Sequence, residues 1–273
     1  MKKKKYQWIA TSKEGFVKYL VANVLPHGFR FYFAGEIKPK TDPDYFDRVM
    51  NEKFNYNMSR SERYRRKSAK GPDGTPLGLA NVHYLRYERF YVLIATYGGH
   101  PFFSHHMDIT RDQSGRVTEK RKYYRDIHRD PLFFRGWSEQ AGMEVCYSIR
   151  TVSGGGYKAK RLWKDPGVPE FDGKSRVRVR IARDAFTTLQ ADFTQRAKSR
   201  RWSADGLEAA VWGLPYLPYR PIREQLWGMV RRMNEARKER GFKDKLNPKR
   251  CIRYEIPAIK AFEPVGDEGR VAA

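Results

Sequence analysis

Cysteine is scarce in this chain of 273 residues, which contains only Cys146 and Cys251. Both lie in stretches where apolar and polar residues alternate, and this favours two reduced thiols in a core over a disulfide. No group of cysteine and histidine residues has the spacing of a zinc site. The sequence therefore predicts neither a disulfide scaffold nor a bound metal.

Long hydrophobic runs are also missing, and no stretch approaches the roughly 20 apolar residues of a membrane-spanning helix. The first ten residues, MKKKKYQWIA, are basic, but no apolar stretch follows them as a secretory signal peptide requires. We therefore expect a cytoplasmic protein without a membrane partner.

Acidic residues are few relative to basic ones, because 31 Asp and Glu accompany 55 Lys and Arg and give a net charge of +24. The excess is shared equally between residues 1–150 and 151–273, so it does not belong to one detachable tail. A compact domain with this much self-repulsion is expected to have a polyanionic partner, and nucleic acid is the commonest one. Hydrophobic residues make up 40% of the chain, which is enough for a packed core.

The first predicted elements follow the order strand, helix, strand, strand. Residues 27–37 alternate phenylalanines with other residues, as in a strand with one apolar face. A helix is expected over 43–54, because Thr41 or Asp42 can cap it and Pro43 suits its first position. Residues 80–99 are too long for one strand and predict a hairpin. This order is typical of a βαββαβ unit.

The predicted fold is α+β, with an RRM-like or ferredoxin-like antiparallel sheet, loop insertions and a helical C-terminal part. Residues 1–152 would form the RRM-like domain, with a basic arm at 59–70 and a long loop at 98–142. Residues 153–263 would add a basic strand and helices, and residues 264–273 a disordered tail.

A row of arginines is predicted in KSRVRVRIARD, residues 174–184. In a strand, Arg176, Arg178 and Arg180 share one face and the intervening apolar residues share the other. Like charges about 7 Å apart on a strand repel one another unless carboxylates or phosphates neutralise them. The planar guanidinium group binds paired oxyanions well, so we predict phosphate contacts, with internal ion pairs as the alternative.

Further basic residues have aromatic residues beside them in the sequence. This combination suits single-stranded nucleic acid because bases stack on rings while cations hold the backbone.

The basic arm at 59–70 begins with a capping box from Ser59 to Glu62, which predicts a helix that has almost no apolar face. SGGGYKAK, residues 153–160, is either a phosphate-binding glycine loop or a flexible hairpin loop, and it lacks the spacing of a P-loop. The predicted nucleic-acid-binding residues are Arg60, Arg63, Arg66, Lys67, Lys120, Arg121, Lys122, Tyr124, Lys158, Lys160, Arg161, Arg176, Arg178, Arg180, Arg200, Arg201 and Trp202.

One cluster has catalytic potential, in GGHPFFSHHMD at residues 98–108. His100, His105, His106 and Asp108 can hold a divalent metal such as Mg²⁺ or Mn²⁺, or a histidine can act as the base in RNA cleavage. Tyr123 or Tyr124 would then be the nucleophile. A polar loop with exposed histidines is the alternative interpretation. No other nuclease-like arrangement supports an enzyme, so no cofactor is expected outside this alternative.

These features predict a sequence-tolerant binder of RNA or single-stranded DNA rather than an enzyme, because no recognition helix for duplex DNA stands out. Such a protein would be a subunit of a ribonucleoprotein, mobile-element, replication or defence system, with other protein subunits as further partners. The alternative from another class is an endonuclease that uses the histidine cluster. A third hypothesis is a basic scaffold bound to an acidic protein.

Overall fold

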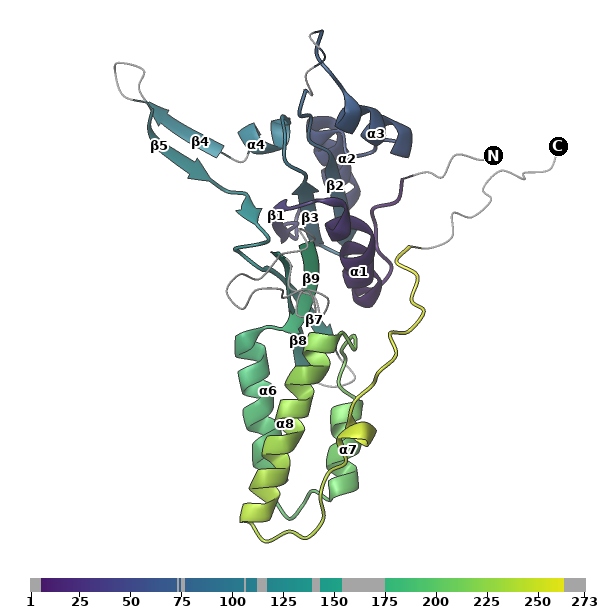
Figure 1. The fold of residues 1–273 in the computed structure, drawn as a ribbon, viewed down its shortest axis with the longest axis vertical. Helices are drawn as coiled ribbons and strands as arrows, with labels where there is room; N and C mark the ends of the chain where they lie inside the picture. The colour runs from purple at the N-terminus through teal and green to yellow at the C-terminus, as the bar shows by residue number, and fades with distance from the viewer. Residues whose placement is uncertain are drawn as a thin grey trace, which may run out of the picture. The chain divides into compact units, whose positions relative to one another are not determined.

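The computed structural model describes residues 6–72, 74, 77–105, 107–111, 117–138, 143–153 and 175–262. They form a mixed α+β protein with antiparallel sheets, which confirms the predicted class at that level (Figure 1). The chain divides into two compact units. Unit 1 comprises residues 1–130, 151–176 and 259–273, and unit 2 comprises residues 131–150 and 177–258. The boundary expected at residue 152 stays a prediction.

Unit 1 contains a four-stranded sheet in the order β2-β3-β1-β6, in which each neighbouring pair is antiparallel. The hairpin predicted over 80–99 is confirmed, because β2 and β3 pair directly and turn at Glu88 and Arg89. Glu88 has a φ of 51°, a left-handed conformation that side chains other than glycine adopt infrequently. The strands are β1 (Phe31–Glu36), β2 (Val82–Tyr87), β3 (Phe90–Ala95) and β6 (Arg125–Asp126).

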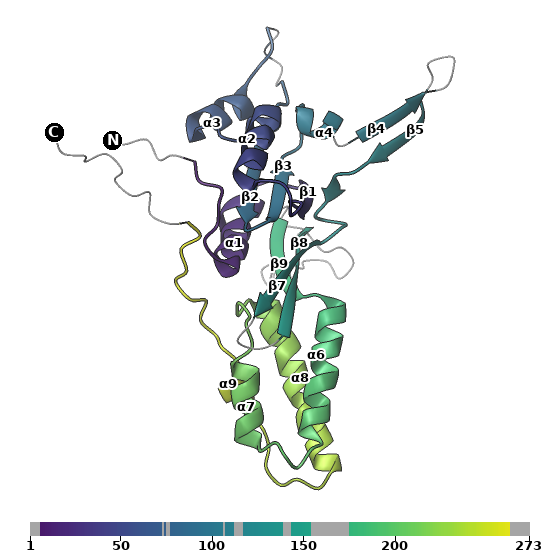
Figure 2. The same cartoon turned by 180° about the vertical axis from the view of Figure 1, so that it is seen from behind.

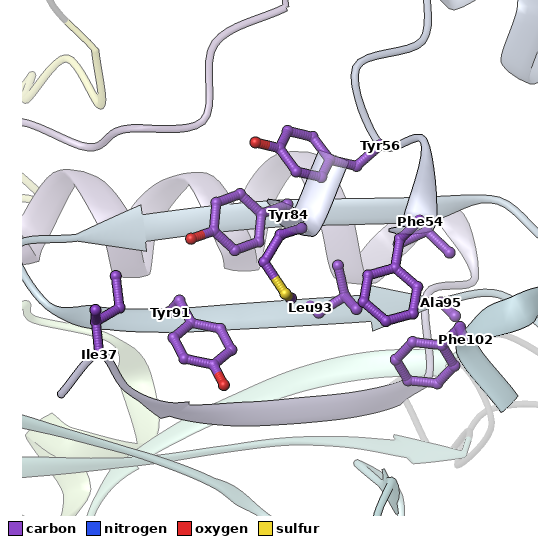
Figure 3. Packing of buried hydrophobic residues seen from close by; sticks show 10 residues of the cluster. Ile37, Phe54, Tyr56, Tyr84, Tyr91, Leu93, Ala95 and Phe102 are labelled. Atoms are coloured by element: carbon purple, nitrogen blue, oxygen red, sulfur yellow. The ribbon is translucent and has the colours of Figure 1, made fainter. Parts of the chain in front are cut away.

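Helix α2 (Pro43–Phe54) contributes to the core on one face of this sheet, and its predicted start is confirmed. The Asp42 carboxylate accepts hydrogen bonds from the main-chain N–H groups of Asp44 and Tyr45, both at 3.2 Å. Tyr56 and Tyr84 stack in this core with ring centroids 4.6 Å apart. Figure 3 shows the cluster, whose buried members are Ile37, Met50, Phe54, Tyr56, Val82, Tyr84, Tyr91, Leu93, Ala95 and Phe102.

The opposite face of the sheet is covered by a segment that the sequence analysis did not assign. Helix α1 (Lys13–Tyr19) continues into the π-helical turn η1 (Leu20–Val24) and the 3₁₀ turn η2 (Leu25–His27). The Phe16 and Phe90 rings pack edge to face. Four residues of this segment are fully buried, namely Phe16, Val17, Leu20 and Val24. Both faces of the sheet are therefore occupied by protein.

Two details concern the start of strand β1 and the edge of the sheet formed by β2. Gly28 takes a left-handed φ of 86° after η2, so β1 begins at Phe31 rather than at residue 27 as predicted. At the β2 edge of the sheet, residues 8–10 lie parallel to β2, because the Arg86 N–H donates to the Trp8 carbonyl and the Ala10 N–H to the Arg86 carbonyl, both at 2.7 Å.

The region 98–142 has more secondary structure than the long loop that the sequence suggested. Helix α4 (Pro101–His105) precedes strands β4 (Met107–Arg111) and β5 (Val117–Lys122), which pair as a two-stranded antiparallel sheet (Figure 1). Strand β7 (Leu132–Ser138) follows β6. The elements are short and β5 lacks apolar alternation, so the sustained periodicity that predicts an element is missing.

Unit 2 combines a three-stranded sheet, in the order β7-β8-β9, with helices α6, α7 and α8 that extend beyond one end of the strands (Figure 2). The Gln225 side chain bonds both the N–H and the carbonyl of Ile181, at 2.9 and 3.0 Å. The Tyr147 hydroxyl accepts a hydrogen bond from the Leu217 N–H at 3.0 Å. The elements besides β7 are β8 (Met143–Ser153), β9 (Ser175–Ile181), α6 (Arg183–Ala197), α7 (Ala204–Trp212), α8 (Arg220–Glu239) and α9 (Pro248–Cys251).

The helices of unit 2 follow their sequence patterns closely. The helical C-terminal part that the sequence predicts is confirmed in α7 and α8, and the Ser203 hydroxyl caps α7 by accepting a hydrogen bond from the Gly206 N–H. The segment RCIRYEIPAIKAF, residues 250–262, suggests a final strand by its sequence, but this prediction is wrong, because the segment has no strand after α9. In the described portion of the chain, no helix combines the length and apolarity needed to cross a membrane.

Candidate nucleic-acid interface

Strand β9 has the alternation that the sequence predicted. Arg176, Arg178 and Arg180 are exposed, whereas Val179 and Ile181 are 1% and 3% exposed and belong to the core. Side chains alternate across a strand, so the arginines point away from the side of the sheet that Val179 and Ile181 bury.

Neighbouring strands add cations to the same side of the sheet. Arg135 on β7 is exposed, and Arg150 on β8 is half-buried. Arg135 is opposite Cys146, and Phe133 is opposite Ser148, in the antiparallel register of β7 and β8. The Phe133 ring is 48% exposed on this side.

We call this surface the arginine face and define it by five residues of unit 2: Phe133, Arg135, Arg150, Arg178 and Arg180. Among the side chains that the structure describes, no carboxylate forms an ion pair with any of these four arginines. Their mutual repulsion is therefore not relieved by a described acidic neighbour, and an external anion would stabilise the arrangement.

The predicted basic arm is a docked helix, α3 (Arg60–Ser68), and its capping box is confirmed. The Arg63 guanidinium donates to the carbonyls of Tyr56 at 2.6 Å and Val82 at 2.8 Å, and it lies 4.9 Å from the centroid of the Tyr6 ring. Arg66 similarly donates to the Ala80 carbonyl at 3.1 Å. These two arginines attach α3 to the rest of unit 1.

Arg63→Ala is expected to lower the free energy of unfolding by about 2–3 kcal/mol, because buried carbonyls lose a charged donor. Arg60→Ala is the matched control, since Arg60 is exposed on the same helix and its removal should change stability by less than about 0.5 kcal/mol. Urea unfolding of both variants measures the difference. Equal stability of the two variants would show that α3 is not held by Arg63.

Arg60 and Lys67 are the members of the predicted set on α3 that are exposed. Lys120, Arg121 and Lys122 lie on β5, where only the backbone is described. Lys158, Lys160 and Arg161 fall outside the described residues. These positions stay predictions.

The turn after α6 contains Arg200, Arg201 and Trp202. The two arginines are exposed, and the Trp202 ring is half-buried beneath the Arg196 guanidinium, 5.2 Å from the ring centroid. The Trp202 carbonyl accepts a hydrogen bond from Arg237 at 3.0 Å. Trp202 thus has a packing role in this turn.

The histidine cluster is only partly within the described structure. The His100 Nδ1 accepts a hydrogen bond from the Phe102 N–H at 3.0 Å, and burial lowers the pKa of His100 to about 4. His105 is exposed at the end of α4. His106 lies outside the described residues, and Asp108 is described only as backbone in β4. Among the described residues, no group of three His, Cys, Asp or Glu side chains is placed to hold a metal ion.

Tyr124, a candidate nucleophile of the catalytic alternative, lies in an aromatic cluster. Its ring contacts Phe31, Phe102 and Phe103, with centroid distances of 5.9, 5.9 and 5.1 Å. These contacts assign the ring to packing at one end of the unit 1 sheet.

Of the predicted residues, Arg178 and Arg180 thus share one surface with Arg135 and Arg150, which the sequence analysis missed. The combination of cations and an exposed ring suits electrostatic binding and stacking rather than acid–base chemistry. Comparisons with protein-family models, curated proteins and solved structures find no match to this chain.

Proposed function

We propose that this protein binds single-stranded RNA or DNA through the arginine face. The observation that carries the proposal is the set of four arginines that share one sheet face with the exposed Phe133 ring, without a described carboxylate partner. Phosphates would supply the missing negative charge, and the ring would stack on a base. The net charge of +24 supports binding with little sequence preference.

The paired strands that carry the arginine face favour a preformed binding surface. The arginines project from paired strands rather than from a loop, and buried side chains such as Tyr147 and Val179 lie on the other side of the sheet. The Gln225 amide fixes the end of β9 through both of its hydrogen bonds to Ile181. A surface held in this way loses less conformational entropy when a strand of nucleic acid binds.

We also infer a ferredoxin-like arrangement for unit 1. Its strand order, with α2 between β1 and β2, supports a βαββαβ plan in which α4 and the β4–β5 hairpin replace the second long helix. RRM domains bind RNA on an open sheet face, but α1 covers that face here. The proposed binding surface is therefore in unit 2. Membership of a ribonucleoprotein, mobile-element, replication or defence system remains part of the proposal.

Arg178→Ala is expected to weaken binding to labelled oligouridylate and oligothymidylate by similar factors, because a phosphate contact is lost in each. The plot of log K against log salt should become shallower by about one unit. Fluorescence anisotropy over a series of salt concentrations measures both effects. Arg232→Ala, an exposed arginine of α8 outside the arginine face, is the matched control.

Two outcomes would contradict the proposal at different levels. If the wild-type protein binds neither strand in dilute buffer, nucleic-acid binding itself is wrong, and co-purification with an acidic protein would favour the scaffold hypothesis. If the wild-type protein binds but Arg178→Ala keeps the same affinity and salt slope, the arginine face is not the site.

A further inference from the structure

A second surface of unit 2 combines cations with accessible rings. It is an open groove along α8, bordered by Tyr254 from the segment that follows α9. The residues of α8 in the groove lie off the stripe that packs into the core, which includes Ile222, Leu226 and Met229. We call it the α8 groove, and its lining residues are Arg220, Arg223, Glu224, Trp227, Arg231 and Tyr254.

The charges in the α8 groove are unevenly paired. Glu224 forms an ion pair with Arg220, with 3.0 Å between its carboxylate oxygen and the arginine Nε. Neither Arg223 nor Arg231 has an ion pair with a carboxylate in the described part of the chain. Two cations are thus available to an anionic ligand.

The rings of the α8 groove lie beside these cations. The Arg223 guanidinium is 5.1 Å from the centroid of the Tyr254 ring, which holds both groups at the groove. The Tyr254 side chain is 48% exposed, and Trp227 is half-buried. Large apolar rings at the surface next to unpaired arginines are the combination that nucleotides contact, because a nucleotide presents a flat base and a phosphate together.

We propose that the α8 groove binds one nucleotide of single-stranded nucleic acid, with the base stacked on Trp227 or Tyr254 and the phosphate held by Arg223 and Arg231. This inference rests on the proposed function and adds a site that reads the presence of a base. An acidic peptide would engage the two arginines but would leave the two rings without a partner, so the nucleotide fits the groove better.

The test compares a labelled oligothymidylate with an abasic strand of the same length. Trp227→Ala is expected to weaken binding of the oligothymidylate at least about fivefold, because a stacked base is lost, and to leave the abasic strand unaffected. Trp227→Phe should keep most of the affinity. Trp212→Ala, which removes a 48% exposed tryptophan of α7 outside the groove, should change neither measurement.

Tyr254→Ala provides a second test that leaves α8 intact, and thermal unfolding checks that each variant folds. The groove assignment is overturned if both ring variants bind oligothymidylate like the wild-type protein, or if they lose affinity equally for the two strands. Failure of the proposed function is a different result, in which the wild-type protein binds neither strand. If Arg178→Ala weakens binding of both strands while Trp227→Ala and Tyr254→Ala bind like the wild-type protein, the arginine face is supported and the groove is rejected.

Discussion

Replacing Asp47 with alanine is expected to lower the free energy of unfolding by about 3–5 kcal/mol, because a buried cation would lose its partner. Asp47 is 4% exposed and Arg86 is 6% exposed. The carboxylate accepts hydrogen bonds from the Arg86 Nε at 3.0 Å, from the Tyr84 hydroxyl at 2.6 Å and from the Trp8 indole at 2.8 Å. Urea unfolding, with the slope compared between variants, measures the loss.

Asp44→Ala is the matched control for this prediction. The Asp44 carboxylate lies 3.2 Å from Arg86 but is 80% exposed, so its removal should cost less than about 1 kcal/mol. A second variant, in which Asp47→Ala is combined with Arg86→Met, should recover part of the loss because the unpaired charge is gone. If Asp47→Ala unfolds at the wild-type urea concentration, this ion pair does not hold α2 against the sheet.

The stability of the protein is expected to fall steeply between neutral and acidic pH because of His83. His83 is 7% exposed, and its ring nitrogens meet the hydroxyls of Tyr6 at 2.5 Å and Tyr19 at 3.3 Å. Burial, followed by the nearby charge of Arg63, lowers the pKa of His83 from 6.5 to about 3.

The sign follows from where the proton binds. Between pH 6.5 and about 3, the unfolded chain carries a proton on this imidazole and the folded chain does not, so falling pH favours unfolding. One such group contributes about 1.4 kcal/mol per pH unit across that window. The free energy of unfolding, measured in urea at a series of pH values, should therefore decrease with this slope or more.

His83→Gln is expected to flatten this part of the pH profile, whereas His27→Gln, at an exposed position, should leave it unchanged. The pKa of His100 is also lowered, to about 4, so the variant retains some pH dependence above that value. Superimposable profiles for His83→Gln and the wild-type protein would assign the acid sensitivity to other groups.

The elements predicted correctly from the sequence carry their signals locally. Helix α2 has a capping aspartate and a proline at its start, and α8 has an apolar stripe and a terminal glycine. Helix α1 was missed although Ser12 caps it and Phe16, Leu20 and Val24 repeat at helical spacing. This stripe covers the second face of the sheet through contacts between segments that are distant in the sequence. A local sequence pattern does not reveal such contacts.

The same distinction applies to the candidate site. The β9 arginines were predicted because alternation is a property of one strand, but Arg135 and Arg150 join them only through strand pairing. Arg63 and Arg66 were assigned to phosphate by composition, and the structure directs their guanidinium groups to main-chain carbonyls. Charge counts do not distinguish a cation that faces solvent from one that satisfies the backbone.

The N-terminal segment beside β2 has a consequence for how the protein behaves at high concentration. An outer strand with free amide and carbonyl groups is a template on which other copies can polymerise. Residues 8–10 occupy those groups of Arg86, and β6, with two residues, leaves little backbone for such growth on the opposite side. The four-stranded sheet is thereby protected from edge-to-edge aggregation at both margins.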